Sequence, residues 1–270
     1  MSIKTIIFKL FKSNKKSAYK HLKKISSKKL VFPVEKEKQK DSRNYKYVAT
    51  ISPNETITQI DLSPKFNSIR NQLSLGSCQS FAVISVLEYL WNKDKNETQD
   101  LSEKYTYYAI RYWNGDEDKN VGATIFQAVK SPFINGYCFE DNFPYDLNYK
   151  EYPPMKARIA AGMLKLYLPK SYWEVNMNID DVKQCLRDGN PVIFGMTLYS
   201  SFNNTTSIVP TPKTNESVLG GHAMVIVGFD DEKSCFKVRN SWGSAWGDNG
   251  YCWLPYILFA KYAFDPYIIK

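Results

Sequence analysis

Residues 71–78 read NQLSLGSC and lead directly into an apolar segment, CQSFAVISVLEYLW, at residues 78–91. This segment contains no glycine or proline, and apolar side chains occupy almost every face of a helix drawn through it. The pattern predicts a buried helix of about a dozen residues. Ser77 stands immediately before the segment, in the position of a residue that caps a helix N-terminus. Cys78 is therefore expected in the first helical turn.

The first turn of a helix favours an ionised thiol at Cys78. Unpaired backbone amides and the positive end of the helix dipole stabilise a thiolate, and thiols in such places have pKa values of about 3.5 to 7.5. Attack by a thiolate near neutral pH is the interpretation that this position supports. The structural alternative is that Cys78 is one of the small, inert cysteines common in protein cores.

A second candidate lies on a predicted β-hairpin. The apolar run GHAMVIVGF at 221–229 is followed by a polar turn at 230–233 and by a returning strand that ends at Asn240. A turn centred on Asp231 places His222 opposite Asn240, with Cβ atoms about 4.5 to 5.5 Å apart. The Asn240 amide oxygen is then expected to accept from one ring nitrogen of His222 and to direct the other at Cys78, 144 residues earlier in the chain.

Three motifs in this order resemble the papain family of cysteine peptidases, to which the cathepsins belong. Gln72 lies six residues before Cys78, residues 76–78 repeat the family's Gly-Ser-Cys, and residues 240–251, NSWGSAWGDNGY, follow its Asn-Ser-Trp-Gly-x-x-Trp-Gly-x-x-Gly-Tyr block. The resemblance covers roughly residues 60–258. It implies an α+β, papain-like fold, with a mainly helical subdomain, a β-barrel-like subdomain and the active-site cleft between them.

Carried over position by position, the resemblance implies a role for each matching residue. Cys78 attacks the scissile carbonyl, and His222 protonates the leaving amine and later activates water. Asn240 orients His222, and Trp242 covers the hydrogen bond between them. The side-chain amide of Gln72 and the backbone N–H of Cys78 form the oxyanion hole.

The resemblance is looser at other positions. Gly122 and Ala123 fall where the family binds extended substrate, although an ordinary loop glycine before a helix at 123–130 explains them equally well. Leu75 and Gln79 stand where the family usually has a disulfide-bonded cysteine and a tryptophan. The sequence Leu-Gly-Ser-Cys instead resembles a disulfide-poor branch of the family that is found in bacteria and large DNA viruses.

Cysteine content and the N-terminus bear on the compartment. The chain has five cysteines, an odd number, no run of 18 apolar residues, and charges at Lys4 and Lys9 where a signal peptide needs an uninterrupted apolar region. We therefore expect an intracellular or virion-associated protein with no signal peptide, no transmembrane segment and mostly reduced thiols. Cys235 and Cys252 are expected to be two free buried thiols, although neighbouring strands could bring them together.

The basic charge belongs to an N-terminal arm, residues 1–57, which precedes a predicted catalytic domain at 58–270. Residues 1–44 contain 14 lysines and arginines and 3 acids, whereas residues 45–270 contain 22 and 24. Three explanations stay open. The arm is an inhibitory pro-segment that lies along the cleft, or it binds an acidic partner, either nucleic acid or an anionic membrane surface, or it is a solvated tail without a partner.

Local patterns predict a mainly helical half at about 70–150 and a mainly β half at about 155–265. Beyond the helix at Cys78, helices are expected at 102–113, 123–130 and 179–188, and strands at 192–198, 223–229, 236–240 and 251–254. No metal-ligand cluster and no phosphate-binding glycine loop is present in the sequence, so neither a metal nor another cofactor is expected.

Together these observations predict a cysteine endopeptidase, made as a precursor, that hydrolyses polypeptide substrates. Internal cleavage is favoured because an exopeptidase needs a charged feature to bind a chain terminus. In the family that this sequence resembles, carboxypeptidase-type members use an extra loop that carries histidines, and here no histidine other than His222 lies beyond His21. One alternative is a catalytically silent papain-like protein that binds a partner or has a structural role and whose basic arm contacts an acidic partner. Another is acyl transfer to an amine, because that reaction begins with the same thioester.

Overall fold

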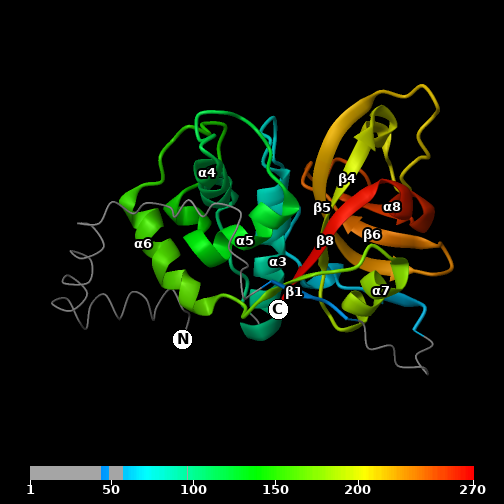
Figure 1. Ribbon diagram of the computed structural model, residues 1–270, viewed down its shortest axis with the longest axis horizontal. Helices are drawn as coiled ribbons and strands as arrows, with labels where there is room; N and C mark the ends of the chain where they lie inside the picture. The colour runs from blue at the N-terminus through cyan, green and yellow to red at the C-terminus, as the bar shows by residue number, and fades with distance from the viewer. Residues whose placement is uncertain (1–43, 49–56, 96) are drawn as a thin grey trace.

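The computed structural model describes residues 44–48, 57–95 and 97–270. A group of helices and a mixed β-sheet stand side by side in an α+β fold, with helix α3 (Cys78–Lys95) between them (Figure 1). No helix in this part of the chain is both long enough and apolar enough to cross a membrane.

The helical half is built around α3. Ser102 caps the next helix through its side chain, and Thr124 and Gln127 form a reciprocal capping box at the one after it. Because Thr124 is the cap, this helix begins two residues later than predicted, and it also continues five residues further. The helices and short 3-10 helices of this half are α4 (Glu103–Asn114), α5 (Ile125–Asn135), η2 (Glu140–Asn142), α6 (Met155–Leu164) and η3 (Lys165–Tyr167).

The β half is a mixed sheet with two further helices, α7 (Ile179–Arg187) and α8 (Tyr256–Tyr262). The strands pair in the order β1-β3-β8-β4-β5-β6-β7, and β2 also pairs with β5. The outer strands β1 and β7 do not pair with each other, so the barrel-like subdomain is an open sheet in the described residues. Its strands are β1 (Asn44–Lys46), β2 (Gln59–Asp61), β3 (Tyr172–Glu174), β4 (Val192–Tyr199), β5 (Val218–Asp230), β6 (Cys235–Arg239), β7 (Tyr251–Pro255) and β8 (Ala263–Ile269).

A shared hydrophobic core holds the two halves together. Val83 and Ile84 on α3 belong to the same buried cluster as Val225 and Val227 on β5. Burial of a Val or Ile side chain contributes about 1.5–3 kcal/mol, so this cluster supplies a large part of the attraction between the halves. The N-terminus of α3 and the first half of β5 are thereby held at one junction.

The boundary between the halves differs from the one predicted. The sequence predicts that residues 155–164 belong to the β half, but they form α6. Its Ala157 and Ala161 pack with Tyr105 and Tyr108 of α4 in a buried cluster. The helical half therefore extends through η3, to Tyr167. The β half also runs past residue 265, because β8 continues to Ile269.

Part of the predicted arm belongs to the folded sheet. β1 pairs in parallel with β3, and the side chain of Tyr47, which is 4% exposed, packs into the core of the β half. The Tyr47 hydroxyl donates a hydrogen bond to Asp188 Oδ2 at 2.8 Å, and the Tyr45 and Trp173 rings lie 4.7 Å apart. Most of the predicted arm, residues 1–57, lies outside the described residues. Its segment 44–48 covers the edge of β3.

Truncation tests the contribution of this segment. The free energy of unfolding should be about 3 kcal/mol lower for a chain that begins at residue 58 than for one that begins at Asn44. The shorter chain loses a buried tyrosine and exposes the edge of β3. Urea unfolding of the two chains measures the difference. Tyr47→Phe in the longer chain is the matched control, since it removes the hydroxyl alone and should cost about 1 kcal/mol. Equal unfolding midpoints for the two truncations would contradict the prediction.

Candidate active site

Cys78 is the first residue of α3, as the sequence predicts. The carbonyl of Ser77 accepts hydrogen bonds from the backbone N–H groups of Ser80 and Phe81, which places Ser77 at the N-cap position. The Ser77 hydroxyl lies 2.7 Å from the hydroxyl of Tyr145. The Cys78 side chain is half-buried and lies at the end of α3 where the unpaired amides and the helix dipole favour negative charge.

Opposing effects act on the ionisation of Cys78 and His222. Burial raises the pKa of the Cys78 thiol, but His222 and the backbone N–H groups of Ala223 and Gln79 lower it, and the net pKa lies below the ordinary value. Burial lowers the pKa of His222, whereas Cys78 and Asn240 raise it, and the net pKa lies above the ordinary value. Both shifts favour a thiolate beside an imidazolium.

Hydrogen bonds determine which nitrogen of His222 carries a proton. His222 Nε2 lies 2.7 Å from Asn240 Oδ1, and the same oxygen accepts from the backbone N–H of Ser241 at 2.8 Å. An atom that receives a backbone N–H bond must be the amide oxygen, so Nε2 of His222 donates to it. In the neutral ring Nδ1 therefore has the free lone pair, and in the imidazolium Nδ1–H is available to Cys78.

The ladder register beneath this hydrogen bond differs from the prediction. His222 does not pair with Asn240, because Val225 is already opposite Arg239 and Asn240 lies beyond the end of β6. The turn spans residues 231–234 and is therefore centred past Asp231, and the register also shifts between residues 226 and 228. The two side chains meet because they reach toward each other past the end of the ladder.

Aromatic rings enclose one side of the imidazole. The ring of Trp242 lies 4.9 Å from that of His222, centroid to centroid, with 42° between the planes. Phe202 and Trp246 pack against Trp242 in turn, at 5.4 and 5.5 Å. His222 is 7% exposed, so its hydrogen bond to Asn240 is largely shielded from water, and the predicted covering residue is beside it.

Two hydrogen bonds fix the orientation of the Gln72 side-chain amide. Its Oε1 accepts from the Ser241 hydroxyl at 2.6 Å, and its Nε2 donates to the Leu75 carbonyl at 2.8 Å. The backbone N–H of Gln72 also donates to the Ser241 carbonyl at 2.8 Å. An amide nitrogen carries two hydrogens, so one N–H of Gln72 is left after the bond to Leu75.

Cys78 and His222 line one cavity of about 470 Å³ that both halves of the protein enclose. The helical half contributes the segment 122–125, which includes the predicted Gly122 and Ala123, and the β half contributes Gly195 and residues 221–223. The structure thus brings the two loosely aligned residues to the same cavity as the predicted nucleophile. Among the described residues, no group of three or more His, Cys, Asp or Glu side chains is arranged to hold a metal ion.

A family model for papain family cysteine proteases matches residues 56–256. The chain belongs to this family. The protease is 32% identical over 243 residues to a peptidase C1-like protein of Acanthamoeba polyphaga mimivirus, an alignment that spans 84% of the protease and 77% of the viral protein. It is 27% identical over 197 residues to a cysteine protease of Blomia tropicalis, and that alignment spans 69% of the protease but 57% of the relative.

Solved structures agree with this assignment. Xylellain, a cysteine protease of Xylella fastidiosa, superposes with a TM-score of 0.78 at 28% identity, over 86% of the protease and 93% of xylellain. Procathepsin L 3 of Tenebrio molitor superposes with a TM-score of 0.62 at 16% identity, over 83% and 73%, and shows the shared fold. The predicted papain-like fold and cysteine-protease class are confirmed.

Two residues that shape the site, Ser241 and Phe264, were not predicted from the sequence. Ser241 contacts both Asn240 and Gln72, and its place between Asn240 and Trp242 in the motif was the signal that could have indicated it. Phe264 lies on β8, which was not predicted, and its ring sits so close to Gly195 that a Cβ at that position would lie 2.2 Å from it. No local pattern links residues 195 and 264, which meet across strands β4 and β8.

The other four cysteines contrast with Cys78. All five cysteines lie in the described part of the chain, and none of them forms a disulfide. Cys235 and Cys252 are both buried and free, as predicted, so strand pairing has not joined them. Burial raises the pKa of Cys138, Cys185, Cys235 and Cys252. Cys78 is therefore the cysteine whose environment favours the thiolate.

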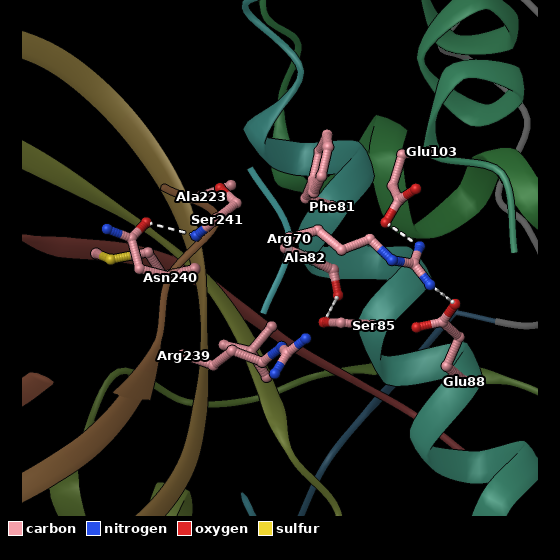
Figure 2. A pocket seen from close by; sticks show the side chains of 12 residues that line it. Arg70, Phe81, Ala82, Ser85, Glu88, Glu103, Ala223, Arg239, Asn240 and Ser241 are labelled. Atoms are coloured by element: carbon pink, nitrogen blue, oxygen red, sulfur yellow. Dashed lines mark hydrogen bonds and ion pairs between the residues drawn. The ribbon is translucent and has the colours of Figure 1, made fainter. Parts of the chain in front are cut away.

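An ionic cluster lies next to the site, where the two halves meet. Figure 2 shows Arg70 between Glu103 and Glu88, with Arg239 and the Asn240–Ser241 segment across a small pocket of about 20 Å³. Arg70 lies 2.5 Å from Glu103 Oε1 and 2.7 Å from Glu88 Oε1, and both glutamates are almost fully buried. Burial raises the pKa of both carboxyls, and Arg70 opposes that rise.

Proposed function

We propose that the protease is an endopeptidase in which Cys78 is the nucleophile and His222 is the acid and base. The observation that carries the proposal is the hydrogen bond from His222 Nε2 to Asn240, because it leaves Nδ1 for the one cysteine with a lowered pKa. The same four residues, Cys78, His222, Asn240 and Gln72, match the family motifs. A silent relative would be free to lose any of them.

The reaction follows from these positions. The Cys78 thiolate attacks the carbonyl carbon of the scissile bond, and the electrons of the C=O bond move onto oxygen. The second N–H of Gln72 and the backbone N–H of Cys78, whose position at the start of α3 leaves it outside the helical hydrogen bonds, stabilise that oxyanion. Nδ1–H of His222 then protonates the leaving amine, the oxyanion electrons re-form the C=O bond as the C–N bond breaks, and a thioester remains on Cys78. Neutral His222 then removes a proton from water as the water oxygen attacks the thioester carbonyl. The C–S bond breaks, which releases the carboxylic acid and regenerates the Cys78 thiolate beside the imidazolium.

Peptide cleavage and thiol labelling test the proposal together. An epoxide or peptidyl fluoromethyl ketone should modify Cys78, and mass spectrometry of a cleaved peptide library should show cuts away from both chain ends. Labelling without any cleavage would support the silent-protein alternative. Amide products formed with an added amine, in place of free acids, would support acyl transfer. Removal of single terminal residues would contradict internal cleavage.

Activity should depend on pH as a bell-shaped curve. The Cys78 pKa is lowered and the His222 pKa is raised, so the thiolate–imidazolium form predominates at pH values above the first and below the second. The value of kcat/KM should rise with a midpoint below the ordinary thiol pKa of about 8.5 and fall with a midpoint above about 6.5.

A variant tests the assignment of the alkaline limb. The hydrogen bond to Asn240 raises the pKa of His222, so Asn240→Ala should move the alkaline midpoint to lower pH as well as reduce the rate. Steady-state kinetics at constant ionic strength measure both limbs. A single rising limb with a midpoint near pH 8.5 would show an unperturbed thiol and contradict the ion-pair mechanism.

We further propose that the arm is an inhibitory segment of a precursor and that the protein acts inside a cell or a virion. A structural neighbour is described as a procathepsin, and the unpaired cysteines suit a reducing compartment. The full chain and a chain that begins at Asn44 should be compared, because the shorter one keeps β1 and Tyr47. Higher kcat/KM for the shorter chain supports inhibition, and equal values rule it out. An acidic partner for the arm has no support among the relatives.

A further inference from the structure

Gln79, directly after the predicted nucleophile, has hydrogen-bonding capacity that the structure leaves unused. Its side chain is 1% exposed, and its Oε1 lies 3.5 Å from Cys78 Sγ. Its Nε2 is buried and has no hydrogen-bond partner among the described residues. Buried polar groups are nearly always paired, and leaving one unpaired costs about 1–3 kcal/mol. An unpaired amide nitrogen beside a reactive sulfur therefore points to a partner in another state of the site.

The present orientation of the Gln79 amide suits the neutral thiol. The S–H group of Cys78 is a weak donor, and the Gln79 Oε1 is positioned to accept from it. A thiolate has no proton to donate, so the same oxygen would then face a negative charge. The arrangement seen here is unfavourable for the ionised sulfur.

Rotation of the amide about its last side-chain bond removes this conflict. The terminal torsion of glutamine is broad and roughly two-fold, so a half-turn exchanges Oε1 and Nε2 at little torsional cost. Nε2 has no partner to lose within the described part of the chain, and after the turn its N–H points at Cys78 Sγ. Hydrogen bonds to charged groups are about twice as strong as neutral ones, so the flipped amide favours the thiolate more than the present one favours the thiol.

We propose that Gln79 stabilises the Cys78 thiolate by turning its side-chain amide and donating an N–H to the sulfur. The proposal deepens the proposed function, because it concerns the same nucleophile. It also gives a physical role to a residue that stands where the family usually has a tryptophan, whose side chain has no amide group. Gln79 lines the cavity that Cys78 and His222 share, so it is placed to act during the reaction.

The other groups around the sulfur do not account for this contribution. His222 is the positively charged partner, and the backbone N–H groups of Gln79 and Ala223 are fixed donors. Tyr107 also interacts with Cys78, but burial raises the pKa of Tyr107 to about 12 and its hydroxyl donates to Asn120, so it stays neutral near pH 7. Gln79 is thus a mobile donor in addition to a fixed set.

Alkylation kinetics test the proposal directly. The rate of iodoacetamide modification of Cys78 follows the thiolate fraction, so its pH midpoint reports ionisation without any need for peptide cleavage. Gln79→Met keeps an unbranched side chain of similar size but has no donor. It should move the midpoint up by about one pH unit and reduce the alkylation rate about tenfold at pH values below the midpoint. Gln79→Glu adds a negative charge and should move the midpoint further.

Ser80→Ala is the matched control. Ser80 is also fully buried in the first turn of α3, and its hydroxyl has no partner among the described residues. Ser80 is not among the residues that line the cavity beside Cys78 and His222. Its midpoint should match that of the unaltered protein. An unchanged midpoint in Gln79→Met, or an equal shift in Ser80→Ala, would overturn the proposal.

A measurement on the unaltered protein covers the case in which the Gln79 variants fail to fold. The side-chain 15N signal of Gln79 should shift with pH at the midpoint of alkylation, because the amide changes partner when the thiol ionises. A signal that does not follow this midpoint would overturn the inference. The proposed function fails separately, if the unaltered Cys78 alkylates with the midpoint of an ordinary thiol.

Discussion

Cys78→Ala should lower kcat/KM for peptide hydrolysis by at least about 10⁴-fold. Alanine has no group that can form the thioester, so the variant keeps only the stabilisation that the oxyanion hole and substrate binding provide. Stability should change little, because the Cys78 side chain is half-buried at the start of α3 and does not fill a closed core. Steady-state kinetics with a cleaved peptide and thermal unfolding measure the two effects.

Cys235→Ser provides the matched control for this experiment. Cys235 is the first residue of β6 and pairs with Asp230 at the end of β5, whereas His222 lies near the beginning of β5. Burial raises the pKa of the Cys235 thiol. This variant should keep kcat/KM within about twofold of the unaltered protein, although replacement of a buried thiol by a hydroxyl can reduce stability. If Cys78→Ala retains substantial activity, or if Cys235→Ser loses it, the nucleophile has been assigned to the wrong cysteine.

Arg70→Ala should lower the free energy of unfolding by about 3–5 kcal/mol. Arg70 binds two almost fully buried carboxylates, Glu88 and Glu103, and also lies 2.6 Å from the exposed Asp100. Removal of the guanidinium leaves the buried charges without a cation, and such charges are far more costly in a protein interior than in water. For a chain of this size the loss corresponds to a fall of roughly 6–20 °C in Tm.

The pH dependence of this loss identifies its cause. Glu88 and Glu103 have raised pKa values in the folded protein, and without Arg70 these values should rise further. The carboxyls of the variant therefore take up protons more readily as pH falls, and the neutral forms need no cation. The difference in stability between the unaltered protein and Arg70→Ala should shrink from pH 8 to pH 5. A difference that is constant over this range would indicate lost packing and not lost charge pairing.

Glu103→Gln is the informative companion variant. Glu103 Oε2 is buried and has no hydrogen-bond partner among residues 44–48, 57–95 and 97–270. Burial raises the pKa of this carboxyl, so its ionised form opposes folding at neutral pH. The amide should therefore be tolerated within about 1 kcal/mol. The double variant Arg70→Ala/Glu103→Gln should recover part of the loss, because one uncompensated charge is gone. Strictly additive effects would contradict direct coupling of the two residues.

Local signals predicted much of the helical half. Helices α4 and α5 were both predicted, but their starts were placed one and two residues too early, because Ser102 and Thr124 are caps whose side chains accept from backbone N–H groups three residues later. The same reasoning failed for α6, which has no side-chain cap, and for β8, whose residues 263–269 follow α8 without an intervening turn signal. The hairpin was predicted but its register was wrong, because the turn is centred past Asp231, which leaves Asn240 beyond the end of the ladder and not opposite His222.

The sequence by itself determined the chemical identity of this protein. It places a cysteine at the start of an apolar helix, a glutamine six residues before that cysteine, and a histidine and an asparagine at the open end of a hairpin. These are choices of residue type and short-range order, which amino-acid side chains express locally. Only the tertiary structure decided that Ser241 holds both Gln72 and Asn240, that Tyr47 closes the edge of β3, and that the Gln79 amide faces the sulfur. Such contacts depend on how the shared core seats α3 against β5, and that packing is set by residues far apart in the chain.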